Sequence, residues 1–233
     1  MIKSDDMFIL LNSAKSWFFR KLKVFTSLYL TYTERELSMR RYMHFLKTSN
    51  IEGDYLEFGV YRGKTFINAY HMAKAFGLNM KFYAFDSFEG LPAPTGNDKD
   101  FDAFSEREFA CDLPQFKSIL RNNGVNISAC EFIKGWFNQS LTQKTKKTLP
   151  LRKAALVYVD CDLYESTVPV LDFVKEYLQI GTILVFDDWF SFAGSPKHGE
   201  QKAVAEWLDK NPNISLIEYD NISVAGKAFI VQC

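Results

Sequence analysis

Acidic side chains stand where the apolar runs of this 233-residue sequence end, and their type and position could support chemistry. A carboxylate without a partner is costly inside a core, so burial alone gives no reason to place acids there. One Asp at such a point can cap a helix, but that explanation is much weaker for a whole set. The set consists of Glu57, Asp86, Asp160, Asp162, Asp187 and Asp188.

Two of the runs, 154–162 and 181–189, end in carboxylates that we expect to cluster, namely Asp160, Asp187 and Asp188. Clustered carboxylates favour a hard, oxygen-seeking cation, most simply Mg²⁺. Such an ion can bind a substrate oxygen and lower the pKa of a hydroxyl group. O-methylation needs this, because an alkoxide attacks a methyl donor better than an alcohol does. In the alternative, one of Asp187 and Asp188 only caps or hydrogen-bonds a loop.

Residues 57–65, EFGVYRGKT, are similar to a phosphate-binding P-loop but have one residue too few between Gly59 and Gly63. The two glycines let a ligand approach the backbone between a strand and a helix. Glu57 would repel a phosphate there and attract an ammonium group. The stretch therefore predicts an amino-bearing ligand, and Thr65 could donate a hydrogen bond to the carboxylate of that ligand.

Asp86 closes the next apolar run, at a position where an acid can accept hydrogen bonds from ribose hydroxyls. Together with Glu57, it predicts a nucleoside that carries an amino group. S-adenosylmethionine meets this description, because it has a ribose, an amino-acid tail and a sulfonium.

Apolar runs alternate with helical patterns from residue 53 onward, which predicts a parallel sheet buried on both faces. Ligands of such sheets bind beyond the carboxyl ends of the strands, where the acids stand. The last two runs have no helix between them and predict a hairpin, so one of them should run antiparallel to the rest. The expected strands are 55–60, 81–86, 131–137, 154–162, 181–189, 215–220 and 227–232, and the expected helices are 65–76, 106–123, 166–178 and 201–208.

The first part of the chain, 1–50, is expected to form a helical arm, and 51–233 the main domain. The apolar stretch 7–30 contains four basic residues, which argue against a membrane span. Its large apolar residues recur at helical spacing. Such a helix would pack on its own domain or on a second copy of the chain, or would lie on a membrane surface. The spaced residues are Phe18, Leu22, Phe25 and Tyr29.

Composition limits the function classes. The 28 basic and 28 acidic residues cancel, which gives no electrostatic case for nucleic-acid binding. The four cysteines are scattered without a CxxC pair, which argues against a zinc site and for free thiols. The opening MIKSDD is not typical of a signal peptide, and we expect a cytoplasmic protein.

Five motifs in matching order, within residues 35–210, resemble the macrocin O-methyltransferase family. They are GDYLEFGVYRGKT (53–65), FDSFEGLPAP (85–94), GWFNQSL (135–141), VDCDLYEST (159–167) and FDDW (186–189). Members use S-adenosylmethionine and Mg²⁺ to methylate sugar hydroxyls on natural products. The resemblance implies an α/β, Rossmann-like class I methyltransferase fold. Its seven-stranded, mostly parallel sheet has an antiparallel last strand, and here the N-terminal helical arm is added to it.

The resemblance also implies roles for individual residues. Glu57, Gly59 and Gly63 would line the methionine end of the cofactor. Asp86 with Ser87 and Phe88 would hold the ribose and flank the adenine, beside which Gly135 and Trp136 would lie. Asp160, Asp187 and Asp188 match the metal carboxylates, and Asp160 is also counted with the cofactor-binding residues.

The proton acceptor is left open by the resemblance. Catechol O-methyltransferase, a wider relative, has a Lys base three residues beyond its first metal Asp, and Leu163 occupies that position here. Asp162 is the first candidate, because it shares a strand end with the metal acids. His198 is the second, and its alternative is an exposed loop histidine. The segment 91–105 is expected to be a mobile lid or, alternatively, a plain surface loop.

These inferences favour an O-methyltransferase acting on a small hydroxylated acceptor, a sugar or glycoside. A nicotinamide-dependent oxidoreductase on a similar sheet is one alternative, although GxGxxG is absent and Glu57 is present. A catalytically inactive binding protein of the same fold is the other. The sequence leaves the acceptor, the oligomeric state and the role of the arm undecided.

Overall fold

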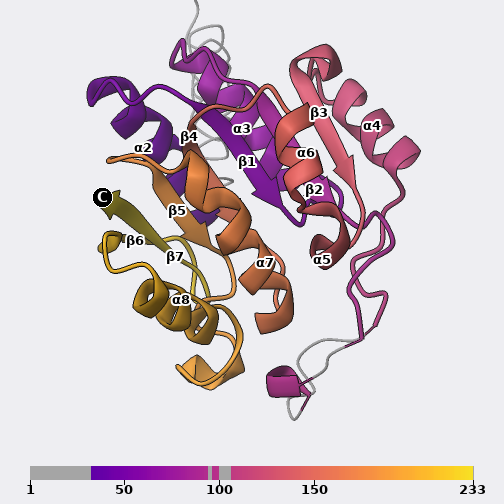
Figure 1. Ribbon diagram of the computed structural model, residues 1–233. Helices are drawn as coiled ribbons and strands as arrows, with labels where there is room; N and C mark the ends of the chain where they lie inside the picture. Colours follow the sequence, from indigo (N-terminus) through magenta and orange to yellow (C-terminus); the bar gives the residue numbers. More distant parts are fainter. Residues whose placement is uncertain (1–32, 94–95, 100–105, 233) are drawn as a thin grey trace, which may run out of the picture.

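The computed structural model describes residues 33–93, 96–99 and 106–232. Its strands form one seven-stranded sheet in the order β3-β2-β1-β4-β5-β7-β6 (Figure 1). The strands are β1 (Asp54–Phe58), β2 (Phe82–Asp86), β3 (Cys130–Lys134), β4 (Ala154–Val159), β5 (Ile183–Phe186), β6 (Ser215–Asn221) and β7 (Lys227–Gln232). The first five pair in parallel, whereas β7 is antiparallel to both β5 and β6. The expected sheet with its antiparallel last strand is confirmed.

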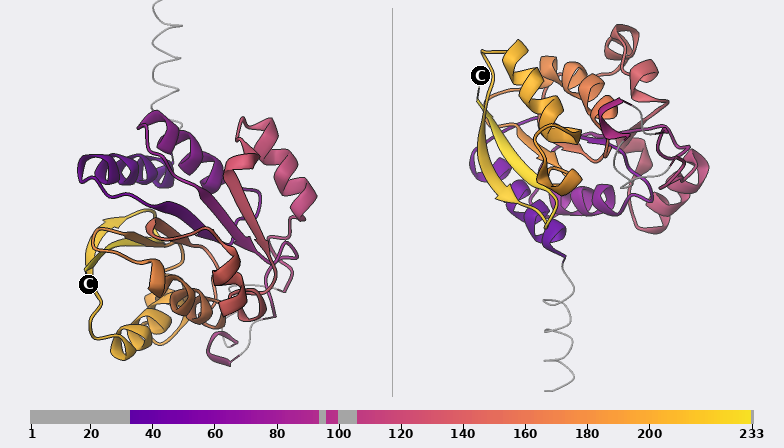
Figure 2. Two further views of the ribbon diagram at one scale, coloured as in Figure 1. Left: turned by 45° about the horizontal axis from the view of Figure 1, so that its top comes forward. Right: turned by 90° about the horizontal axis from the view of Figure 1, so that it is seen from below.

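Helices cover both faces of the sheet, as Figure 2 shows. They are α2 (Glu34–Thr48), α3 (Lys64–Ala75), α4 (Leu113–Asn122), α5 (Phe137–Ser140), α6 (Gln143–Thr148), α7 (Tyr164–Val174) and α8 (Gly199–Lys210). One buried apolar cluster joins the sheet to α2, α3 and α4, and a second joins it to α7 and α8. The carboxyl ends of the parallel strands lie between these two helical layers.

Strand β1 contributes buried side chains to both apolar clusters. Tyr55 lies in the cluster under α2 and α3, while Leu56 and Phe58 lie in the cluster under α7 and α8. Side chains that alternate between faces have a period of two, and all of these are buried. By the same alternation Glu57 shares a face with Tyr55, which decides where its carboxylate lies.

Several predicted boundaries differ from the observed ones, and two of the differences have a clear local cause. The helix predicted at 106–123 begins at Leu113, because the side chain of Asp112 accepts a hydrogen bond from the backbone N–H of Gln115 and caps the helix there. The strand predicted at 131–137 ends at Lys134, since Gly135 turns the chain (φ 137°) and α5 begins at Phe137. Neither α5 nor α6 was expected.

Part of the proposed arm can be placed. Helix α2 packs into the core through Met39, Tyr42, Met43 and Leu46, in the same cluster as α3. The predicted helix at 7–30 lies outside the described residues, so the division at residue 50 stays a prediction. In the described ranges, no helix is both long and apolar enough to cross a membrane.

Candidate active site

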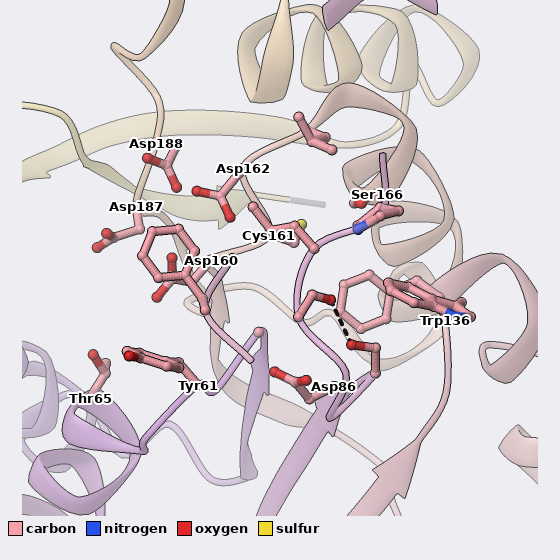
Figure 3. A pocket seen from close by; sticks show the side chains of 18 of the residues that line it. Tyr61, Thr65, Asp86, Trp136, Asp160, Cys161, Asp162, Ser166, Asp187 and Asp188 are labelled. Carbon is pink, nitrogen blue, oxygen red and sulfur yellow. Dashed lines mark hydrogen bonds between the residues drawn. The ribbon is translucent and has the colours of Figure 1, made fainter. Parts of the chain in front are cut away.

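A cavity of about 810 Å³ lies beyond the carboxyl ends of β1, β2, β4 and β5. It is bounded by residues from both halves of the sheet, and its acidic cluster lies to one side of Asp86 and Trp136 (Figure 3). The predicted site residues that line it are Gly59, Thr65, Asp86, Ser87, Gly135, Trp136, Asp160, Asp162, Asp187 and Asp188. Four others, Glu57, Gly63, Phe88 and His198, do not line it.

The turn after β1 depends on glycine. Gly59 has φ 83°, and a Cβ atom there would lie 1.7 Å from the backbone oxygen of Asp160. Gly63 has φ 75° and caps α3 without a side-chain hydrogen bond. The first N–H groups of α3 are therefore left for another acceptor, and Lys64 and Thr65 of this first turn line the cavity. A ligand carboxylate suits this position.

Asp86 holds the same turn from the neighbouring strand. Its Oδ2 accepts the N–H of Val60 at 2.7 Å, and its Oδ1 accepts the N–H of Phe88 at 2.6 Å. Asp86 also lines the cavity, where its carboxylate can receive ligand hydroxyls. Burial raises the pKa of Asp86, and the backbone hydrogen bonds oppose that shift.

Two predicted cofactor residues point into the core. Glu57 is only 1% exposed, and its Oε2 accepts the hydroxyl of Tyr55 at 2.5 Å. Burial raises its pKa well above the usual value. Phe88 is 3% exposed and packs against Phe116, with ring centroids 5.6 Å apart. Their direct contacts with a cofactor stay predictions, which the placement of these side chains does not favour.

The acids at the ends of β4 and β5 do come together. Oxygens of Asp160, Asp187 and Asp188 lie within 4.8 Å of one another. Burial, and then repulsion from Asp187, raises the pKa of Asp160 well above its usual value and that of Asp188 to about 6. Asp162 lies beside them with φ 61°, and burial raises its pKa too. A cation bound among these carboxyl groups would favour their ionised form and offset their mutual repulsion.

The donor set fits a hard divalent cation. It offers carboxylate oxygens, which Mg²⁺ prefers, on the wall of a cavity through which an ion could enter. The guanidinium of Arg35 contacts one acid of the cluster, Asp187, at 2.6 and 2.7 Å. Asp160, Asp162 and Asp188 are left with a charge that a metal ion would balance.

Sequence reasoning missed two charged residues at this cluster. Arg35, the second residue of α2, reaches Asp187 from the other end of the chain. Glu200, in the first turn of α8, is 1% exposed, and its Oε2 accepts the backbone N–H of Asp188 at 3.0 Å. No local pattern joins either residue to the acids, because both arrive through the packing of a helix.

Two aromatic side chains at the cavity were also missed. Tyr61 and Phe109 are 40% and 43% exposed, and their rings meet edge to face at 5.6 Å. Both have positive φ, 41° and 58°, which is costly for bulky residues and is found most often at functional sites. Two backbone hydrogen bonds fix the segment just before Phe109. The N–H of Leu91 donates to the carbonyl of Glu108, and the N–H of Arg107 donates to the carbonyl of Leu91.

His198 lies at the N-cap position of α8, outside the cavity lining. Its ring stacks on Phe192, with centroids 6.0 Å apart. Asp162 lines the cavity and His198 does not, so the geometry favours Asp162 of the two candidates for proton acceptor.

The segment predicted to be a lid is described only in part, without residues 94–95 and 100–105. Asp98 within it is 1% exposed and bridges two helix N-termini. Its Oδ2 accepts the N–H of Tyr164 at 2.5 Å, and its Oδ1 accepts the N–H of Gly199 at 3.1 Å. The mobility of the segment stays a prediction.

Comparison with known sequences identifies a family. The sequence profile described as macrocin-O-methyltransferase (TylF) matches residues 27–221. A mycinamicin III 3''-O-methyltransferase from Micromonospora griseorubida is 31% identical over 147 residues, 60% of this chain and 56% of that one. An 8-demethyl-8-(2,3-dimethoxy-alpha-L-rhamnosyl)-tetracenomycin-C 4'-O-methyltransferase from Streptomyces olivaceus is 28% identical over 145 residues, 60% of this chain and 54% of that one. The chain thus spans a little over half the length of these relatives.

Solved structures share the fold. The O-methyltransferase NovP superposes with a TM-score of 0.71 at 24% identity, covering 84% of this chain and 79% of that one. The calicheamicin methyltransferase CalS11 superposes with a TM-score of 0.70 at 20% identity, covering 99% and 94%.

Proposed function

Since the chain belongs to the macrocin O-methyltransferase family and has the class I methyltransferase fold, we propose that it transfers a methyl group from S-adenosylmethionine to a hydroxyl group of a sugar or glycoside. The observation that carries this proposal is one continuous cavity. It joins the glycine turn and Asp86 to the acids that follow β4 and β5. A methyl donor and a hydroxyl to be activated would meet there.

The cofactor would occupy the half of the cavity beyond β1 and β2. Its carboxylate would lie at the N-terminus of α3, near Thr65, where the helix has no side-chain cap. Its ribose hydroxyls would donate to Asp86, and its adenine would lie by Gly135 and Trp136. In this orientation the sulfonium would face the acidic half.

The acidic half would hold a divalent cation on Asp160, Asp187 and Asp188. When bound, the cation would supply a Lewis acid that lowers the pKa of the acceptor hydroxyl. A carboxylate oxygen of Asp162 would take the proton of that hydroxyl, because Asp162 lines the cavity beside these acids.

The acceptor is proposed from the cavity and from what the relatives are named for. Those relatives are named for 3''-O-methylation of mycinamicin III and for 4'-O-methylation of a rhamnosyl-bearing tetracenomycin. Tyr61 and Phe109 offer apolar faces at the same cavity, on which the C–H face of a sugar ring or an apolar aglycone could rest. We place the acceptor between this aromatic pair and the acids.

Calorimetry separates this function from the oxidoreductase alternative. The protein should bind S-adenosylmethionine and S-adenosylhomocysteine and should not bind NAD. Binding of NAD without binding of S-adenosylmethionine would overturn the proposal. Binding of S-adenosylmethionine by a protein that methylates no hydroxylated acceptor would instead support the inactive binding protein.

A further inference from the structure

Arg35 makes an ion pair whose geometry is unusually complete. Its Nε donates to Oδ1 of Asp187 at 2.7 Å, and its Nη2 donates to Oδ2 at 2.6 Å. Such a fork fixes the plane of the carboxylate as well as its charge. From β4, the hydroxyl of Tyr158 donates to Oδ1 as well, at 2.5 Å. Asp187 is therefore held from two sides by donors that sequence reasoning did not connect with it.

The acceptor positions of Asp187 can be counted. A carboxylate offers about four, two on each oxygen. Arg35 and Tyr158 occupy both positions of Oδ1, and Arg35 occupies one of Oδ2. What is left is one position on Oδ2, on a carboxylate that lies within 4.8 Å of oxygens of Asp160 and Asp188. Asp187 is thereby prepared to give a cation a single oxygen.

The first turn of α2 is itself fixed. Thr33 and Glu36 form a capping box, in which Glu36 Oε2 accepts the N–H of Thr33 at 2.6 Å. Thr33, Arg35 and Glu36 all line the cavity. Met39 and Met43 anchor the same helix in the core. Arg35 is thus presented by a capped and packed helix, although its own side chain is 44% exposed.

We infer that Arg35 is a positioning residue for the divalent cation, and that α2 belongs to the metal site by orienting Asp187. This inference rests on the proposed function, and it assigns the helix a role beyond packing. Ligating carboxylates are commonly held by such outer hydrogen bonds, whose loss weakens metal binding by about 10- to 100-fold.

The direction in which metal affinity changes when Arg35 is removed distinguishes this inference from simple charge repulsion. The guanidinium is a positive charge next to the proposed cation, so its removal would tighten metal binding if charge alone mattered. If orientation matters more, removal of the fork weakens binding. Arg35→Lys keeps the charge and loses the planar fork. Both Arg35→Ala and Arg35→Lys should therefore bind the cation more weakly.

The test is calorimetric titration of the full-length chain with Mg²⁺ and with Mn²⁺, without acceptor. Arg35→Ala and Arg35→Lys should lower the affinity about 10- to 100-fold. Arg41→Ala is the matched control, because Arg41 also lies on α2 and pairs with an aspartate, Asp220, outside the cavity lining. It should leave the metal affinity unchanged. Affinity for S-adenosylhomocysteine should be similar in all variants.

Unchanged or tighter metal binding by Arg35→Ala would overturn the inference, and so would an equal loss in Arg41→Ala. If Arg35→Ala fails to fold, Tyr158→Phe removes the other donor to Asp187 and should weaken metal binding by itself. A wild-type chain that binds S-adenosylhomocysteine but no cation would overturn the metal assignment as a whole. That result is distinct from failure of Arg35 alone, in which the wild type and the variants bind metal alike.

Discussion

At the scale of single residues, Asp162 carries the proposed proton transfer. It lines the cavity beside the acid cluster, and its backbone is left-handed, with φ 61°. Asp162→Asn should lower kcat by about 100- to 10,000-fold, the range found when a general base is lost. The affinity for S-adenosylmethionine should change little.

Steady-state kinetics with both substrates, together with calorimetry, would measure these effects. Asp172→Asn is a suitable control, because Asp172 is an exposed carboxylate on α7. A tenfold or smaller loss of kcat in Asp162→Asn would remove this residue from the role of base.

Asp160 carries the other residue-scale prediction. Its carboxylate lies near those of Asp187 and Asp188, and its backbone lies against Gly59. Asp160→Ala should abolish methyl transfer and Mg²⁺ binding. Binding of S-adenosylmethionine should stay nearly intact, because the turn at Gly59 lies against the backbone of residue 160, which the substitution keeps. Activity that survives in this variant, or in wild type treated with EDTA, would show that no metal is needed.

At the scale of elements, Asp98 ties the segment after β2 to two helices. Its carboxylate caps both α7 and α8, and the first turn of α8 also carries Glu200, which accepts the N–H of Asp188. Asp98→Ala leaves two buried N–H groups unpaired and should lower the free energy of unfolding by about 2 kcal/mol. Asp112→Ala, which removes one exposed cap from α4, should cost about half as much.

Urea unfolding monitored by circular dichroism would measure both variants. If Asp98→Ala were no more destabilising than Asp112→Ala, the bridge between the two helices would contribute no stability of its own.

Elements were predictable where the sequence signal is local. Continuous apolar runs located β1, β2, β4 and β5, because parallel strands buried on both faces carry few polar residues. Helices α5 and α6 escaped prediction because four and six residues are too short for a periodic pattern. The acids lie together as expected, since adjacent parallel strands end at one edge.

The rest of the site depends on contacts across long stretches of sequence. Arg35 meets Asp187 only because α2 packs beside the sheet, and Glu200 meets Asp188 only because α8 returns to it. Glu57 shows the opposite case, in which a local rule was available. Alternation along β1 puts it on the face of Tyr55, where its carboxylate accepts the tyrosine hydroxyl instead of lining the cavity.

At the scale of the whole molecule, the two halves of the sheet carry different parts of the proposed site. Strands β1 and β2 end at the proposed cofactor site, and β4 and β5 end at the acids. Helix α2 packs on the core and sends Arg35 to the acidic half, so binding of the cation and docking of this helix should be coupled. The cavity between the halves is where a sulfonium and a hydroxyl would meet.

The most direct test of the proposed function is transfer of a labelled methyl group from S-adenosylmethionine to glycosylated acceptors. The panel would hold sugar nucleotides, glycolipids and glycosylated natural products, with catechols for comparison, each with Mg²⁺ or EDTA. We expect label on a sugar hydroxyl, located by NMR, that appears with Mg²⁺ and is lost in EDTA and in Asp160→Ala. Label on catechols alone, or transfer to a sugar that proceeds equally well in EDTA, would contradict it.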